Sequence, residues 1–168
     1  MRIKVLDIIP QTMADGPGFR TAIYCAGCLH ACKGCHNPQS WSFEAGRWME
    51  VEDLLEVIKA DDLSDVTFSG GDPFYQVEAF TELARRIKEE TRKTIWCWTG
   101  FTLKEIEASE KLSQLLPYLD VLVDGPFILE QRDTDLLFRG SPNQQIIYLH
   151  GAPPEDIIPG TVALEPLR

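Results

Sequence analysis

Alternating strand and helix patterns through the middle of this 168-residue chain constrain its fold more than any other feature. Runs of β-branched and aromatic residues predict strands, and apolar residues at helical spacing predict the helices between them. Such an alternation favours parallel strands joined by helical crossovers, and ligands of these folds bind where the strands end. The predicted strands cover residues 3–9, 20–26, 65–69, 94–98, 119–123 and 145–149, and the predicted helices cover 51–60, 76–91 and 102–116.

The expected fold class is therefore α/β, with mostly parallel strands. Because the chain is too short for eight strand–helix units, we expect a partial, open (βα) barrel. One domain is expected over residues 1–150. Residues 151–168 hold four of the eleven prolines and show no hydrophobic periodicity, which predicts a proline-rich, loosely packed C-terminal extension.

The charge and hydropathy of the chain argue against two classes of partner. A formal net charge of −10 disfavours nucleic-acid binding, which needs clustered Lys and Arg. No apolar run approaches the roughly 20 residues of a membrane span, and the N-terminus lacks the pattern of a secretory signal. We therefore expect a cytoplasmic protein that binds neither nucleic acid nor a membrane.

Three cysteines, Cys28, Cys32 and Cys35, follow the strand predicted over residues 20–26 with the spacing C-x3-C-x2-C. The chain has five cysteines, an odd number, and so tight a cluster without an export signal predicts a metal site and not a disulfide framework. A structural zinc ion takes four protein ligands, and so does an ordinary electron-transfer [4Fe–4S] cluster. Three thiolates on a cluster leave one iron open, where a substrate can bind.

A zinc site is the alternative, because Cys25 could complete a set of four with the other three cysteines. Cys25, however, lies in a strand pattern, where alternate side chains point to opposite faces of the sheet. Cys25 and Cys97 are more readily explained as small buried apolar residues.

Glycine-rich motifs follow the predicted strands. Paired Gly70 and Gly71 let a ligand approach the backbone, whose amides and carbonyls could bind the ammonium or carboxylate of an amino acid. Asp72 after them could instead be only a helix N-cap. Asp124 ends a strand and could hold ribose hydroxyls or a cation, or simply form a turn.

Other side chains near these motifs have weaker signals. His36 could be a ligand or a hydrogen-bond donor to a nucleotide. We expect His30 to face solvent, and Trp96 and Trp98 to belong to the core.

Taken together, these motifs resemble those of the glycyl-radical-enzyme activases of the radical S-adenosylmethionine (SAM) superfamily. The resemblance runs from about residue 15 to residue 147. Its motifs are Asp15-Gly16-Pro17-Gly18 with Arg20; the three cysteines followed by His36-Asn37-Pro38 and Trp41; Ser69-Gly70-Gly71-Asp72-Pro73; Ile95-Trp96-Cys97-Trp98-Thr99-Gly100; Val121-Leu122-Val123-Asp124-Gly125; and Phe138-Arg139-Gly140-Ser141 with Asn143-Gln144.

The resemblance implies an oxidoreductase with a partial barrel of the radical SAM type, in which the three cysteines hold one [4Fe–4S] cluster. The open iron binds SAM through its methionine amino and carboxylate groups. Reductive cleavage of SAM then yields a 5′-deoxyadenosyl radical, which takes a hydrogen atom from a glycine of a partner enzyme. The expected partners are an anaerobic ribonucleotide reductase and an electron donor of the flavodoxin or ferredoxin type.

The resemblance also assigns roles to individual residues. The SAM contacts it implies are Gly70, Gly71 and Asp72 at the methionine end, Gly34, Cys35 and His36 at the nucleotide, and Asp124 near the ribose or a cation. Asp15 and Arg20 would lie where the glycine loop of the partner enters.

Three other functions remain open at this stage. The chain could be a radical SAM enzyme acting on a small molecule, similar to deazaguanine synthases. It could activate another glycyl radical enzyme, such as pyruvate formate-lyase. It could also be a non-catalytic zinc or electron-carrier module, which the metal content would distinguish.

Overall fold

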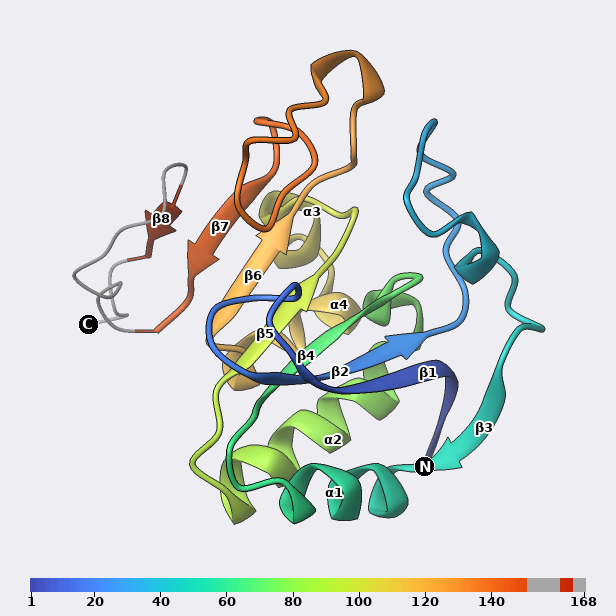
Figure 1. Ribbon diagram of the computed structural model, residues 1–168, viewed down its shortest axis with the longest axis vertical. Helices are drawn as coiled ribbons and strands as arrows, with labels where there is room; N and C mark the ends of the chain where they lie inside the picture. The colour runs from blue at the N-terminus through green and yellow to red at the C-terminus, as the bar shows by residue number, and fades with distance from the viewer. Residues whose placement is uncertain (151–160, 165–168) are drawn as a thin grey trace.

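A computed structural model describes residues 1–150 and 161–164, and its centre is one mixed sheet (Figure 1). The strand order is β3-β1-β2-β4-β5-β6-β7-β8. The strands are β1 (Arg2–Thr12), β2 (Arg20–Cys25), β3 (Arg47–Glu50), β4 (Asp65–Gly70), β5 (Ile95–Trp98), β6 (Val121–Asp124), β7 (Gln145–Tyr148) and β8 (Thr161–Ala163). The helices are α1 (Val51–Ala60), α2 (Val77–Glu90), α3 (Leu103–Glu107) and α4 (Glu110–Ser113), with 3-10 turns at Pro38–Ser40, Pro73–Gln76, Leu116–Tyr118 and Leu129–Gln131.

Parallel pairing dominates the sheet. Strands β2, β4, β5 and β6 pair in parallel, and so do β7 and β8. Antiparallel pairing joins β1 to β2 and to β3, and β6 to β7. The order places β3 and β8 at opposite edges, so the sheet formed by the described strands is open. The predicted α/β class with mostly parallel strands is confirmed.

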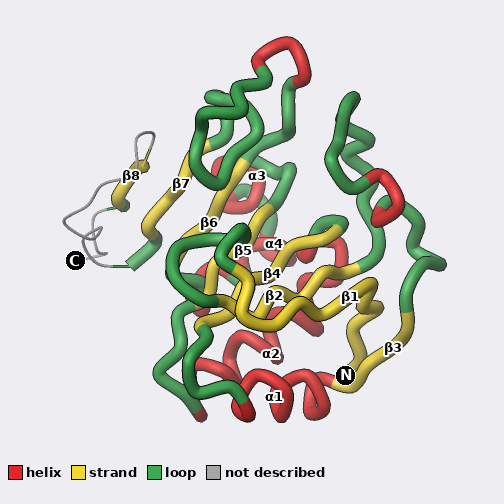
Figure 2. The backbone as a smooth tube through the Cα atoms, viewed as in Figure 1, coloured by secondary structure: helices red, strands yellow, loops and turns green. Residues whose placement is uncertain are grey.

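The larger core lies between the sheet and the helices. Amphipathic helix α2 buries Phe80, Leu83 and Ile87 completely, and Phe80 packs on Phe68 of β4 with ring centroids 4.8 Å apart. A smaller cluster on the strands β5, β6 and β7 is centred on Trp96. The loops that follow the parallel strands extend beyond these cores at one end of the sheet, as Figure 2 shows.

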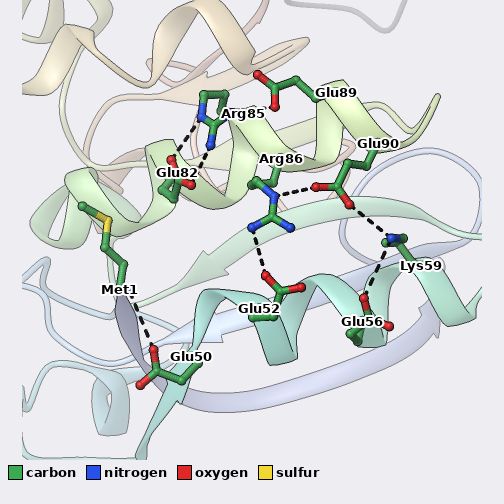
Figure 3. A network of polar contacts seen from close by, with 10 residues as sticks. All are labelled: Met1, Glu50, Glu52, Glu56, Lys59, Glu82, Arg85, Arg86, Glu89 and Glu90. Atoms are coloured by element: carbon green, nitrogen blue, oxygen red, sulfur yellow. Dashed lines mark hydrogen bonds and ion pairs between the residues drawn. The ribbon is translucent and has the colours of Figure 1, made fainter.

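Ion pairs link α1 to α2 on the surface (Figure 3). Arg86 of α2 contacts Glu52 of α1 at 2.9 Å and Glu90 of its own helix at 2.5 Å. Lys59 of α1 reaches Glu90 at 3.1 Å. Solvent screens exposed pairs strongly, so the apolar contacts below them hold the helices together.

One predicted helix is wrong in its extent. Within residues 102–116 the chain forms two short helices, α3 and α4. The break lies at Ser109, which follows the end of α3 and caps the N-terminus of α4 with its side chain. Serine hydroxyls compete in this way with the backbone ladder of a helix. The first helix begins with a capping box between Thr102 and Glu105.

The sheet also gains two edge strands that the sequence pattern does not predict. Edge strand β3 is only four residues long and lies against β1. At the other edge, β8 pairs with β7, so the sheet continues beyond the expected boundary at residue 150. The rest of the predicted C-terminal extension, residues 151–160 and 165–168, lies outside the described residues. None of the helices in the described part of the chain is both long and apolar enough to cross a membrane.

Candidate active site at the ends of the parallel strands

An open cavity of about 470 Å³ lies where β2, β4, β5 and β6 end. All three motif cysteines line it, together with residues from the loops that follow β4, β5 and β6. The predicted site residues in its wall are Asp15, Cys28, Cys32, Cys35, His36, Gly70, Gly71 and Asp72, and further wall residues are Ala14, Tyr24, His30, Asn37, Ser69, Trp98, Thr99, Gly100, Gly125, Phe127, Phe138, Arg139, Gly140 and Gln144. The parallel topology thus brings motifs together that are up to about 130 residues apart in the sequence.

The cysteine loop leaves β2 at Gly27, whose φ of +104° is a conformation that suits glycine. Residues 40–41 close the loop from behind, because their carbonyl oxygens accept hydrogen bonds from the amides of Gly27 (2.7 Å) and Cys28 (3.1 Å). Burial raises the pKa of Cys28 to about 11. Binding of a metal at this sulfur must therefore displace a proton.

The donor set fits a three-thiolate cluster and does not fit the four-cysteine zinc alternative. Cys25 is completely buried in the helix-side core and does not line the cavity. Among the described residues, no three His, Cys, Asp or Glu side chains are grouped closely enough to hold one metal ion. The three motif cysteines all line the cavity, and three is the donor number that leaves one iron of a [4Fe–4S] cluster without a protein ligand. The buried state expected of Cys25 and Cys97 is confirmed.

The glycine pair allows β4 to pack closely against the cysteine loop. A Cβ atom on Gly70 would lie 2.4 Å from the amide nitrogen of Cys25, and one on Gly71 would lie 2.5 Å from the carbonyl oxygen of Gly27. Hydrogen bonds across the same junction run from the Gly71 amide to Cys25 (2.7 Å) and from the Asp72 amide to Gly27 (2.9 Å). Both glycines are required by this packing, and both also face the cavity.

Asp72 is buried, and both of its carboxylate oxygens are engaged by the protein. Oδ1 accepts a hydrogen bond from the Phe74 amide (2.9 Å), as an N-cap does. Oδ2 accepts from His30 Nε2 (2.6 Å), Thr99 Oγ1 (2.8 Å) and the Gly100 amide (2.9 Å). The expectation that His30 faces solvent is therefore wrong, because this contact draws its ring into the site.

Asp15 also lines the cavity and lies in the loop that joins β1 to β2. Its Oδ2 atom accepts hydrogen bonds from Tyr24 Oη (2.6 Å) and Thr12 Oγ1 (3.3 Å). Burial, and next the bond to Asp15, raise the pKa of Tyr24, so this phenol stays protonated and donates.

Comparisons with known proteins agree with this geometry. A family model described as a 4Fe-4S single cluster domain matches residues 14–147. A protein of Haemophilus influenzae is 42% identical over 154 residues, which are 86% of this chain and 97% of that protein. A protein of Vibrio cholerae is 43% identical over 149 residues (82% and 92%), and one of phage T4 is 33% identical over 145 residues (83% and 90%). All three are named anaerobic ribonucleoside-triphosphate reductase-activating protein.

The chain belongs to this family of reductase-activating proteins. The family resemblance predicted from the ordered motifs is thus confirmed. Membership also explains why the cysteines, the glycine pair and the loops after β5 and β6 share one cavity.

Within this activating-protein fold, Arg20 has a different position from the one expected. Its side chain is 2% exposed, so the prediction that it touches a partner directly needs correction. The guanidinium donates to Thr67 Oγ1 (2.9 Å) and to the carbonyl oxygens of Val66 (2.8 Å) and Pro17 (3.2 Å). Through these hydrogen bonds, Arg20 holds the loop that carries Asp15 against β4.

Asp124 is also a structural carboxylate in this structure and is absent from the cavity wall. Its oxygens accept hydrogen bonds from the amides of Leu103 (2.8 Å) and Gln145 (3.1 Å), and burial raises its pKa. The neighbouring Gly125 reaches the cavity instead. Gly34 lies in the cysteine loop against Leu129, outside the wall.

Sequence reasoning missed several wall residues of this activating protein. Trp98, expected in the core, faces the cavity and donates from Nε1 to the Phe138 carbonyl oxygen (2.9 Å). Its neighbour Trp96 is 3% exposed and belongs to the core, as expected. Strand alternation was the signal that could have identified Trp98 as a wall residue. Trp98 points to the same face of the sheet as Trp96, but it is the last residue of β5 and therefore adjoins the loop that follows.

Proposed function

We propose that this chain is a radical SAM enzyme that forms a glycyl radical on an anaerobic ribonucleotide reductase. One observation carries the proposal: three cysteines of a single loop line the same cavity as the glycine pair at the end of β4. The names of the relatives favour the reductase as partner over pyruvate formate-lyase.

The three cysteines would hold one [4Fe–4S] cluster and leave one iron without a protein ligand. When bound and reduced, such a cluster would supply one electron for cleavage of SAM to methionine and a 5′-deoxyadenosyl radical, and this radical would take a hydrogen atom from a glycine Cα of the partner. The protein contributes the binding, the orientation and the exclusion of water.

Wall residues supply those three contributions. Backbone at Gly70 and Gly71 would face the methionine end of SAM, and backbone at Cys35 and His36 would face the nucleotide. Trp98, Phe127 and Phe138 make part of the wall apolar, which keeps water from a reactive radical. Asp15, which also lines the cavity, would meet the glycine loop of the reductase.

The proposal extends to the fold and to the further partners. The open sheet is taken as the partial barrel of the radical SAM type. Asp124, whose carboxylate holds the amides of Leu103 and Gln145, would act near the ribose by placing Gly125, which lines the cavity. A flavodoxin or ferredoxin in the cytoplasm would donate the electron. Nucleic acid and membrane are not required as partners.

Reductant-dependent cleavage of SAM tests the proposal. The protein is reconstituted anaerobically with iron and sulfide and reduced, and 5′-deoxyadenosine and methionine are measured after addition of SAM. We expect both products in equal amounts, and none with Cys32→Ala. Adding the reductase should then produce a glycyl radical signal by electron spin resonance. An intact, reduced cluster that neither cleaves SAM nor responds to it in the presence of the reductase would refute the proposal.

A further inference from the structure

His30 lies between two of the cysteines, yet the proposed chemistry gives it no role. Its side chain is 15% exposed, and its Nε2 atom is 2.6 Å from Oδ2 of Asp72. A carboxylate oxygen only accepts hydrogen bonds, so the histidine nitrogen is the donor. A side chain of the cysteine loop is thus bonded to the loop at the end of β4.

Asp72 connects this histidine to a third loop. The same Oδ2 atom accepts from the Thr99 hydroxyl (2.8 Å) and the Gly100 amide (2.9 Å), both after β5. The carboxylate is 1% exposed, so removing one donor leaves buried negative charge that water cannot reach. The three loops around the cavity are therefore coupled through one carboxylate.

Packing also holds the imidazole ring in place. Phe101 meets the ring edge-on with centroids 4.6 Å apart, and Tyr75 packs at 5.3 Å. A Cβ atom on Gly100 would lie 2.5 Å from Cδ2 of the ring, so glycine at position 100 provides the space for it. Residues outside the cysteine motif thus pack closely around the ring of His30.

We propose that His30 is a positioning residue that holds the cysteine loop at a fixed distance from the glycine pair through its bond to Asp72. This inference rests on the proposed function, because its consequence is the placement of the cluster against the methionine end of SAM. Asp72 then acts through the protein and does not itself touch SAM. Loss of outer-shell partners of metal ligands typically costs about 10- to 100-fold in metal affinity or activity, and we expect an effect of the same order on SAM binding here.

Two substitutions separate the hydrogen bond from the packing. His30→Phe keeps an aromatic ring against Phe101 and Tyr75 but lacks the donor. His30→Gln places an amide nitrogen near the position of Nε2 and restores the donor. Each reconstituted variant is assayed for iron and sulfide, for SAM affinity by equilibrium dialysis, and for the change that SAM causes in the spin resonance signal of the reduced cluster.

We expect His30→Phe to retain the iron and sulfide content of the wild type but to bind SAM about 10- to 100-fold more weakly. His30→Gln should recover most of the affinity. Adding Asp72→Asn to His30→Phe should cost less than the two single losses combined, because the two residues share one interaction. Ser109→Ala removes a helix cap away from the cavity and should lower stability without changing SAM affinity.

Two results would overturn the role of His30: equal SAM affinity in His30→Phe and wild type, or loss of iron in parallel with loss of SAM binding. If His30→Phe does not fold, His30→Asn replaces it, because its shorter amide cannot reach Asp72. If the wild type with a full cluster binds no SAM, the proposed function fails together with this inference. If the wild type and His30→Phe bind SAM equally well, the inference about His30 fails and the proposed function stands.

Discussion

Tyr24 Oη donates a 2.6 Å hydrogen bond to Oδ2 of Asp15 across the wall of the cavity. Thr12 donates to the same oxygen at 3.3 Å, so both donors converge on one side of the carboxylate. Thr67 Oγ1 also donates to the backbone carbonyl oxygen of Asp15 at 2.7 Å. Asp15 is therefore held in orientation at the place where the partner is expected to enter.

Removing the phenol should weaken activation of the reductase and leave SAM cleavage intact. We expect Tyr24→Phe to lose a hydrogen bond worth about 1 kcal/mol, which corresponds to roughly a fivefold fall in the rate of glycyl radical formation. The rate of 5′-deoxyadenosine release in the absence of the reductase should stay at the wild-type level. Tyr118→Phe, on the 3-10 turn before β6, is the matched control. An equal fall in both assays would contradict the prediction.

Loss of the buried guanidinium should destabilise the whole chain. Arg20→Met leaves the carbonyl oxygens of Val66 and Pro17 without their donor, and we expect a loss of about 2–4 kcal/mol in the free energy of unfolding. Urea denaturation measures it as a lower midpoint at constant slope. Arg92→Met, at an exposed site, should change stability by no more than about 0.5 kcal/mol. A stable Arg20→Met protein that fails only with the reductase would restore the direct partner contact.

The cysteines should divide into ligands and core residues. Cys25→Ala should keep the full iron and sulfide content, because Cys25 is buried away from the cavity. Cys32→Ala should lose the cluster, because it removes one of three thiolates. Iron and sulfide analysis after anaerobic reconstitution measures both. Equal loss of metal in the two variants would point to a four-cysteine site.

Asp124 should make stability depend on pH. Burial raises its folded-state pKa, so the folded state binds its proton more tightly than the unfolded state does. The contribution of Asp124 is fully present below its unfolded pKa of 3.8 and is lost as the pH rises through the folded value. Relative to Asp124→Asn, the wild type should therefore become more stable as the pH falls from 7 toward 4. Urea denaturation at both pH values checks this, and a constant difference between the two proteins would rule out the shifted carboxyl.

The gathering of the motifs at one cavity could be predicted from the sequence. The strand–helix alternation makes the strands parallel, and parallel strands place their following loops at the same end of a sheet. This reasoning alone brings Cys28 near Gly70. The same reasoning does not predict edge strands such as β8, because a strand of three residues is too short to show a hydrophobic period.

The direction in which individual side chains point was decided by the tertiary structure. His30 lies in a loop that has no hydrophobic period, so the sequence predicted that it faces solvent, and only the family resemblance placed Arg20 where a partner enters. Folding instead placed a buried acceptor next to each, Asp72 for His30 and the Val66 carbonyl oxygen for Arg20. The sequence by itself determined which residue types the site contains and at which end of the sheet they meet. Only the packed structure decided which of them face the cavity and which hold it in shape, because buried polar groups must find partners that are distant in the chain.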